Sequence, residues 1–107
     1  MNSLFQKKRS ASLDSIAVVS GELVSANLDE EVVILGFKSG SYYSLDQVGA
    51  FVWNLLQKPQ KVSAIRDSIL NEYDIDFQQC EQDLLNLLND LADKGLIEIK
   101  ADTLDSA

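Results

Sequence analysis

The chain has 107 residues, which is enough for one domain and too few for two independent hydrophobic cores. Hydrophobic residues make up 46% and charged residues 24%, a balance typical of a folded globular protein and not of a disordered one. The 17 acidic residues outnumber the 9 basic ones, and the formal net charge of -8 disfavours nonspecific binding to nucleic acid.

Missing residue types exclude several kinds of site. The sequence has no histidine, which excludes catalytic pairs with an imidazole base and imidazole zinc ligands. Its single cysteine, Cys80, excludes an internal disulfide and a multi-cysteine metal centre, so we expect no cofactor. The lone cysteine favours a cytoplasmic protein. The sequence also lacks a signal peptide and any apolar run of about 20 residues, so we expect no membrane contact.

The N-terminal segment, residues 1–20, shows no clear hydrophobic periodicity. Its first twelve residues are polar, basic and rich in serine, so we expect a flexible arm. Three of the basic residues, Lys7, Lys8 and Arg9, lie in this segment, and the rest of the chain is therefore more acidic than the whole.

Three strand-like runs follow, separated by short turns. They span residues 22–28, 31–37 and 41–45. The first run alternates polar and apolar side chains, the period of a half-buried strand. The second is rich in β-branched residues, which favours a buried strand, and the third contains two tyrosines. Gly40 ends the second turn, where its tolerance of positive φ suits a hairpin. The runs predict a small antiparallel sheet.

The hydrophobic period then changes to that of helices. Asp46 is a good N-cap for the first helix, and Pro59 ends it. Asp76 and Gln79 have the spacing of a capping box before the third helix, and Gly95 suits the position after its end. The apolar positions of the three predicted helices are Val48, Phe51, Val52, Leu55 and Leu56; Val62, Ile65, Ile69, Leu70 and Tyr73; and Phe77, Cys80, Leu84, Leu87, Leu88 and Leu91.

The order of these elements predicts an α+β fold of the winged helix-turn-helix type. We expect a three-stranded antiparallel sheet followed by three helices and a short terminal strand at residues 96–100. The domain is expected to span residues 21–100, and residues 101–107 are expected to be a tail. The predicted core contains Phe51, Leu55, Ile65, Ile69, Leu84 and Leu88.

Three stretches of sequence resemble a known family. They read GSYYSLDQVGAFVWNLL, IRDSILNEYDID and CEQDLLNLLNDLADKGLIEI. Over residues 21–100 the chain resembles the PqqD-like leader-peptide-binding domains, also called RiPP recognition elements. It is most similar to the stand-alone members from lasso peptide pathways. Its first helix ends NLLQKP and lacks the Cys-Asp-Gly segment typical of the pyrroloquinoline-quinone member.

The resemblance implies a non-catalytic module that binds the leader of a ribosomally made precursor peptide. In the family the leader adds as a strand beside the third strand, against the third helix. The module presents the leader to a modifying enzyme such as a leader peptidase, cyclase or radical enzyme. The chemistry fits, because residues 41–45 contain no proline and no charge that would block strand addition. The expected peptide-binding residues are Ser41, Tyr42, Tyr43, Ser44, Leu45, Cys80, Asp83, Leu84, Leu87 and Leu91.

These positions also have structural interpretations. Tyr42 and Tyr43 point to opposite faces of a strand, so one of them belongs to the core. The leucines of the third helix pack in the core, and Cys80 behaves as a small hydrophobic residue. Asp83 belongs to the solvated face of the helix or contacts a basic residue of the leader.

Other functions were weighed against leader binding. A winged helix can bind DNA through its third helix, but Glu81, Asp83, Asp90 and Asp93 would repel phosphate there. Catalysis is disfavoured because no carboxylate has a partner that would perturb its pKa. A structural or regulatory protein-interaction subunit is the alternative. We expect a monomer or weak dimer, because an exposed strand edge invites self-pairing.

Overall fold

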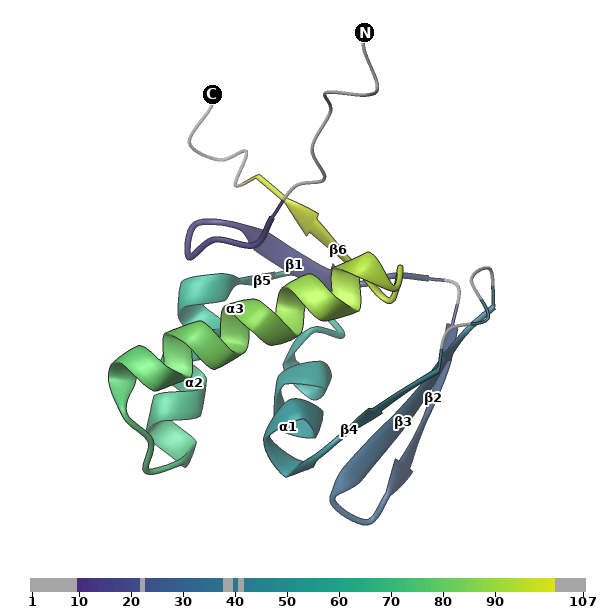
Figure 1. Ribbon diagram of the computed structural model, residues 1–107, viewed down its shortest axis with the longest axis horizontal. Coiled ribbons are helices and arrows are strands. Elements are labelled where there is room, and N and C mark those ends of the chain that lie inside the picture. Colours follow the sequence, from purple (N-terminus) through teal and green to yellow (C-terminus); the bar gives the residue numbers. More distant parts are fainter. Residues whose placement is uncertain (1–9, 22, 38–39, 41, 102–107) are drawn as a thin grey trace, which may run out of the picture.

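The structure is a computed structural model that describes residues 10–21, 23–37, 40 and 42–101. Its three helices have the two small sheets on different sides of them (Figure 1). The elements are β1 (Ile16–Val19), β2 (Leu23–Leu28), β3 (Glu31–Gly36), β4 (Tyr42–Leu45), α1 (Gln47–Leu55), β5 (Gln60–Lys61), α2 (Val62–Glu72), α3 (Phe77–Asp93) and β6 (Ile97–Lys100). The predicted α+β fold, with its meander, three helices and terminal strand, is confirmed.

The predicted meander forms one sheet in the order β2-β3-β4, antiparallel throughout. Alternate residues of β3, Val32 and Ile34, are buried, and they pair with Leu45 and Tyr43 of β4. The core face of the sheet therefore runs through these four residues. Gly40 has a φ of 65°, as its place at the end of the hairpin turn predicts, whereas the neighbouring residues 38, 39 and 41 lie outside the described part of the chain.

A second sheet, in the order β5-β1-β6, was missed by the sequence analysis. Its central strand β1 lies within residues 1–20, which were expected to form a flexible arm. That expectation is wrong for Ile16–Val19, because β1 pairs with β6 over four residues and Ala17 is fully buried. A four-residue apolar run has no measurable period, and the β1 partners are far away in sequence, so no local signal marks the strand.

The first helix is capped as predicted but is rotated about its axis. The Asp46 carboxylate accepts a hydrogen bond of 2.9 Å from the Gly49 backbone N–H. The buried residues of the α1 segment are Gly49, Ala50, Val52, Trp53 and Leu56. Phe51 and Leu55, expected in the core, are only half-buried at its margin. The reason is that the Gly49 side of α1 lies against β4, where a Cβ atom would be 3.0 Å from Leu45 Cδ2. Phe51 is about 200° away around the helix and packs against the Tyr73 ring, with ring centres 5.6 Å apart.

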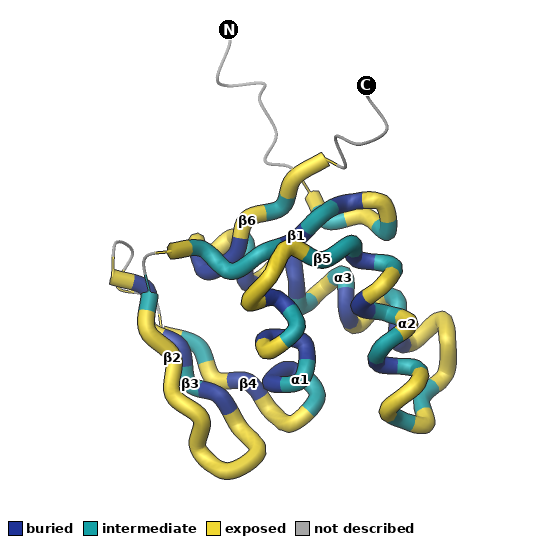
Figure 2. Tube along the Cα trace, turned by 180° about the vertical axis from the view of Figure 1, so that it is seen from behind, coloured by how far each residue is buried: buried dark blue, intermediate teal, exposed yellow. Residues whose placement is uncertain are grey.

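The second and third helices supply the predicted core residues Ile65, Ile69, Leu84 and Leu88, all of which are buried. Figure 2 shows buried and exposed positions interspersed along both helices. The Asp76 carboxylate accepts a hydrogen bond from the Gln79 backbone N–H at 3.1 Å, as the capping spacing predicted. Gly95 has a φ of 74° and follows the helix at its C-terminal end.

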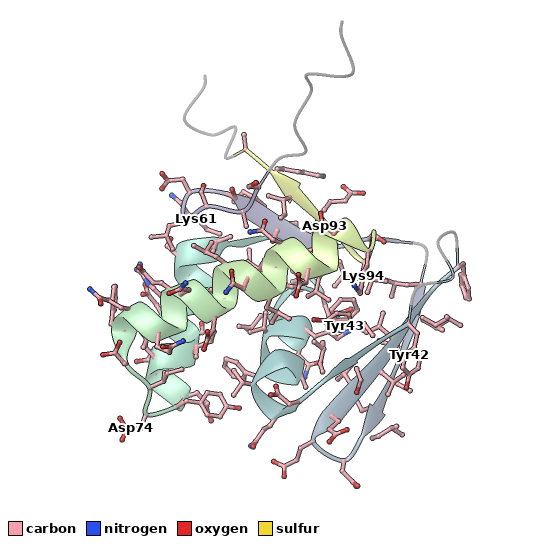
Figure 3. The ribbon with its side chains drawn as sticks, in the orientation of Figure 1. Tyr42, Tyr43, Lys61, Asp74, Asp93 and Lys94 are labelled. Atoms are coloured by element: carbon pink, nitrogen blue, oxygen red, sulfur yellow. The ribbon has the colours of Figure 1, made fainter. Side chains whose placement is uncertain are left out.

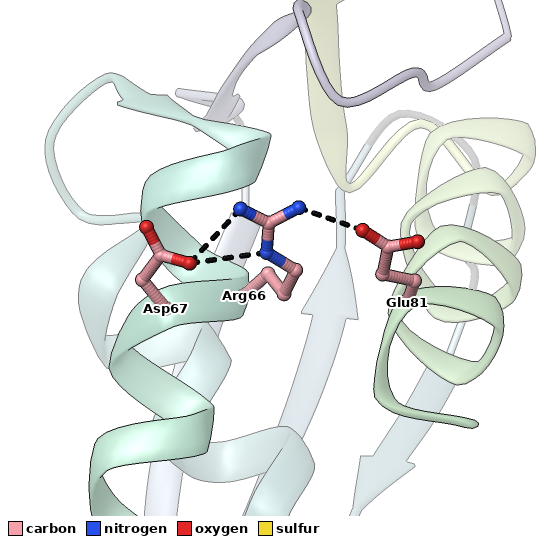
Figure 4. A network of polar contacts seen from close by, with 3 residues as sticks. All are labelled: Arg66, Asp67 and Glu81. Carbon is pink, nitrogen blue, oxygen red and sulfur yellow. Dashed lines mark hydrogen bonds and ion pairs between the residues drawn. The ribbon is translucent and has the colours of Figure 1, made fainter. Parts of the chain in front are cut away.

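One ionic cluster joins α2 to α3 (Figure 4). The Arg66 guanidinium donates a 2.6 Å hydrogen bond to the Glu81 carboxylate and two 3.0 Å contacts to Asp67. The guanidinium carbon also lies 4.9 Å from the centre of the Phe77 ring. Phe77 was predicted on the apolar face of the third helix but is 50% exposed, because it covers this cation instead of entering the core.

Candidate functional site

The outer edge of β4 is open to a further strand. Among the described residues β4 pairs with β3 alone, so one of its two edges has no strand beside it. Tyr42–Leu45 carries no charge and no proline. The edge strand β6 of the other sheet differs, because Glu98 and Lys100 point their charges into solvent and form a 3.6 Å ion pair. Charges of this kind discourage edge pairing, and β4 lacks them.

A cavity of about 460 Å³ lies beside this edge, between β4, α1 and α3. Its walls are mainly apolar, with carboxylates at two positions. The lining residues are Tyr43, Ser44, Leu45, Asp46, Val48, Gly49, Val52, Ile69, Ile75, Cys80, Asp83, Leu84 and Leu87. A volume in this range is large enough to hold one or two amino-acid side chains of a bound peptide.

The two tyrosines of β4 point to opposite faces of the sheet (Figure 3). Tyr43 is half-buried and lines the cavity, and the Lys94 ammonium lies 5.4 Å from the centre of its ring. Burial, and secondarily the nearby Asp90 carboxylate, raise the pKa of the Tyr43 phenol, so the hydroxyl is neutral at physiological pH. Tyr42 is 65% exposed on the other face. Of the two, Tyr43 is therefore the one placed to touch an occupant of the cavity.

The first half of α3 forms the opposite wall. Cys80 and Leu84 are buried and Leu87 is half-buried, so the wall presents apolar atoms over about two helical turns. Burial raises the pKa of the Cys80 thiol, and the nearby carboxylates act in the same direction. The thiol is therefore protonated and packs as a small hydrophobic side chain. Asp83 is exposed at the rim, where its carboxylate accepts a 2.8 Å hydrogen bond from the Gln79 side-chain amide.

The structure brings seven of the ten predicted site residues to one cavity. Leu91 does not line it, because its side chain is fully buried near the end of α3. Tyr42 lies on the other face of the sheet, and Ser41 lies outside the described residues. The residues brought together are Tyr43, Ser44, Leu45, Cys80, Asp83, Leu84 and Leu87.

The sequence analysis missed the contribution of α1 and of the turn before α3. Val48 and Val52 were assigned to the apolar positions of the first helix, and Ile75, which directly precedes the capping residue of α3, was not among the expected site residues. Gly49 lines the cavity too. A Cβ atom at this position would lie 3.0 Å from Leu45 Cδ2, so the glycine allows α1 to approach β4 closely.

Comparison with known proteins agrees with this geometry. The family model of the coenzyme PQQ synthesis protein D (PqqD) matches residues 31–97, which include β3, β4 and all three helices. This chain belongs to the PqqD family. The resemblance seen in the sequence is therefore confirmed. None of the curated proteins searched matches the chain closely.

Two solved structures are similar to this PqqD-family chain. The first is TbiB1 in complex with the TbiA(beta) leader peptide, with 41% identity over 76% of this chain and 94% of that chain and a TM-score of 0.70. The second is a lasso peptide synthetase B1 complexed with the leader peptide, with 22% identity over 77% and 96% of the two chains and a TM-score of 0.67. The second likeness shows the shared fold. Within the described residues of this chain, no helix is long and apolar enough to span a bilayer.

Proposed function

We propose that this protein binds the leader region of a ribosomally made precursor peptide in lasso peptide biosynthesis, without catalysing a reaction on it. The leader adds as a strand to the open edge of β4 and is presented to a modifying enzyme. The similarity to TbiB1, which was solved with a leader peptide, supports this proposal. The lone, buried Cys80 fits a protein that works in the reducing cytoplasm.

The observation that carries the proposal is an open, uncharged strand edge beside an apolar cavity. A peptide strand on β4 would form main-chain hydrogen bonds with the unpaired edge, and these bonds are independent of leader sequence. Its alternate side chains would point toward α3, into the cavity bounded by Leu84 and Leu87. The main chain thus supplies general affinity, and the cavity selects which side chain fits.

Charge at the cavity rim adds a preference among leaders. The Asp83 carboxylate lies at the rim, and the whole chain has a net charge of -8. A Lys or Arg next to the apolar anchor of the leader would meet this carboxylate. Since such contacts lie near solvent, they should raise the association rate at low salt more than they slow dissociation.

An NMR titration tests the site directly. ¹⁵N-labelled protein is titrated with the leader, about 10–20 residues long, of the precursor encoded beside it, and a scrambled leader of the same composition is the control. We expect the largest amide shifts in Tyr42–Leu45 and in the first half of α3. The proposed site is wrong if the cognate leader shifts β2 (Leu23–Leu28) or β6 (Ile97–Lys100) while β4 stays unchanged.

A further inference from the structure

The outer face of the β2-β3-β4 sheet, which points away from the helices, carries a row of exposed apolar side chains. The register places Val24 of β2 beside Leu35 of β3, and Leu35 beside Tyr42 of β4. Their exposed fractions are 50%, 41% and 65%. Single exposed apolar residues are ordinary, but three in register across three strands form a continuous patch.

The patch continues along the sheet and ends at an acidic turn. The next register row contains Ala26, Val33 and Ser44, none of them charged. Beyond it Leu28 is 57% exposed, next to the exposed acidic residues 29–31. We call the residues Val24, Ala26, Leu28, Val33, Leu35 and Tyr42 the outer face.

The edge of β2 next to this apolar patch is also open and uncharged. β2 is six residues long, contains no charge and no proline, and pairs only with β3 among the described residues. A long uncharged edge strand invites association when nothing covers it. The exposed patch and the open edge adjoin, so they form one surface that suits a protein partner.

The outer face also adjoins the leader site. A leader strand on β4 would become the fourth strand of this sheet, next to Tyr42, and alternate leader side chains would point to the same side as the outer face. A partner seated on the outer face would therefore touch protein and leader together.

We propose that the outer face is the docking surface for the modifying enzyme, and that the enzyme meets it with an apolar patch rimmed by Lys or Arg. The acidic turn at residues 29–31 supplies the complementary charge. A second copy of this chain fits less well, because each copy has a net charge of -8 and its outer face has an acidic turn in place of a basic rim. The inference rests on the proposed function in one respect, namely that the docked enzyme takes up the held leader.

The experiment separates docking from leader binding. The double variant Val24→Thr/Leu35→Thr places β-branched threonine at two exposed positions, so the sheet should still form. A second variant, Glu30→Lys, reverses charge in the acidic turn. Leu87→Ala, in the leader cavity, is the matched control. Each protein, with and without leader, is titrated with the purified leader peptidase and the purified cyclase of the same gene cluster, and leader affinity is measured separately.

We expect the double variant to lower the affinity for one of these enzymes at least tenfold, with leader affinity unchanged within twofold. Glu30→Lys should lower the affinity for the same enzyme severalfold at low salt. Leu87→Ala should lower the affinity for the leader and leave the affinity for the enzyme without leader unchanged within twofold. The inference is overturned if neither enzyme binds the wild type, or if both bind the double variant as tightly as the wild type. It is also overturned if the variant only dissociates a wild-type dimer. If the wild-type protein does not bind the leader, the proposed function is refuted. Enzyme docking is then judged by the enzyme titration without leader.

Discussion

Leu87 and Leu88 are neighbours in α3, and truncating each to alanine should affect different properties. Leu88 is fully buried in the core, whereas Leu87 is half-buried and lines the cavity beside β4. One residue along a helix is a rotation of about 100°, which is enough to move a side chain from the core to the cavity wall. The pair therefore compares stability and leader binding within the same helical turn.

The structure sets the expected magnitudes. Leu88→Ala removes fully buried atoms and should lower the free energy of unfolding by about 2–5 kcal/mol. Leu87→Ala removes three carbon groups worth about 0.8 kcal/mol each when fully buried. Leu87 is mostly buried in the free protein, so about two-thirds of this total, roughly 1.6 kcal/mol, falls on stability. A bound leader would cover the rest, roughly 0.8 kcal/mol, and its loss should raise the leader Kd by about fourfold.

Both quantities are directly measurable. Urea unfolding is followed by the fluorescence of Trp53, the single tryptophan, which is 2% exposed. Leader affinity is measured by the anisotropy of a labelled leader, under conditions where each variant is folded. The reasoning is refuted if Leu87→Ala destabilises the protein as much as Leu88→Ala does while the leader Kd stays within twofold of the wild type.

Three further predictions concern the surroundings of the site. Arg66→Lys keeps the charge but cannot contact both carboxylates of the α2–α3 cluster, so the midpoint of urea unfolding should shift to a lower concentration; an unchanged midpoint would contradict this. Burial raises the pKa of Cys80, so less thiolate is present at any given pH and iodoacetamide should react more slowly than with an exposed cysteine, and more slowly still with leader bound; reaction at the rate of an exposed cysteine would be inconsistent with it. Backbone N–H groups alternate in direction along an edge strand, so of Tyr42→Pro and Tyr43→Pro one should stay folded by circular dichroism but lose the leader, and the other should disrupt β3–β4 pairing. Two folded variants with wild-type affinity would exclude strand addition at β4.

Elements with local signals were predictable from the sequence. Asp46 and Asp76 cap their helices through a bond to the third following N–H, and Gly40 and Gly95 adopt positive φ. Each signal depends on a few adjacent residues. β1 was missed because its register, such as Ile16 opposite Lys100, joins residues at opposite ends of the sequence.

The site was predictable only in part, for a related reason. A hydrophobic stripe shows that Leu84, Leu87 and Leu91 share a side of α3, but not what covers each of them. The chain turns back after the helix, where the Leu96 N–H donates to the Leu91 carbonyl at 3.0 Å, and Leu91 is fully buried there. Residues of the core and residues of the cavity wall are both apolar, so only the three-dimensional packing distinguishes them.

The pairing of β1 with β6 has a consequence for how this domain can be combined with others. Ile16 lies opposite Lys100, so the segment that leads into β1 and the segment that follows β6 lie at the same end of one strand pair. That strand pair belongs to the sheet on the other side of the helices from β2 and β3 (Figure 1). A fluorescent protein, an affinity tag or an entire enzyme could therefore be fused at either terminus through a short linker and leave the β4–α3 cavity accessible. The same geometry makes the domain a portable module that gene fusion can attach to different catalytic partners.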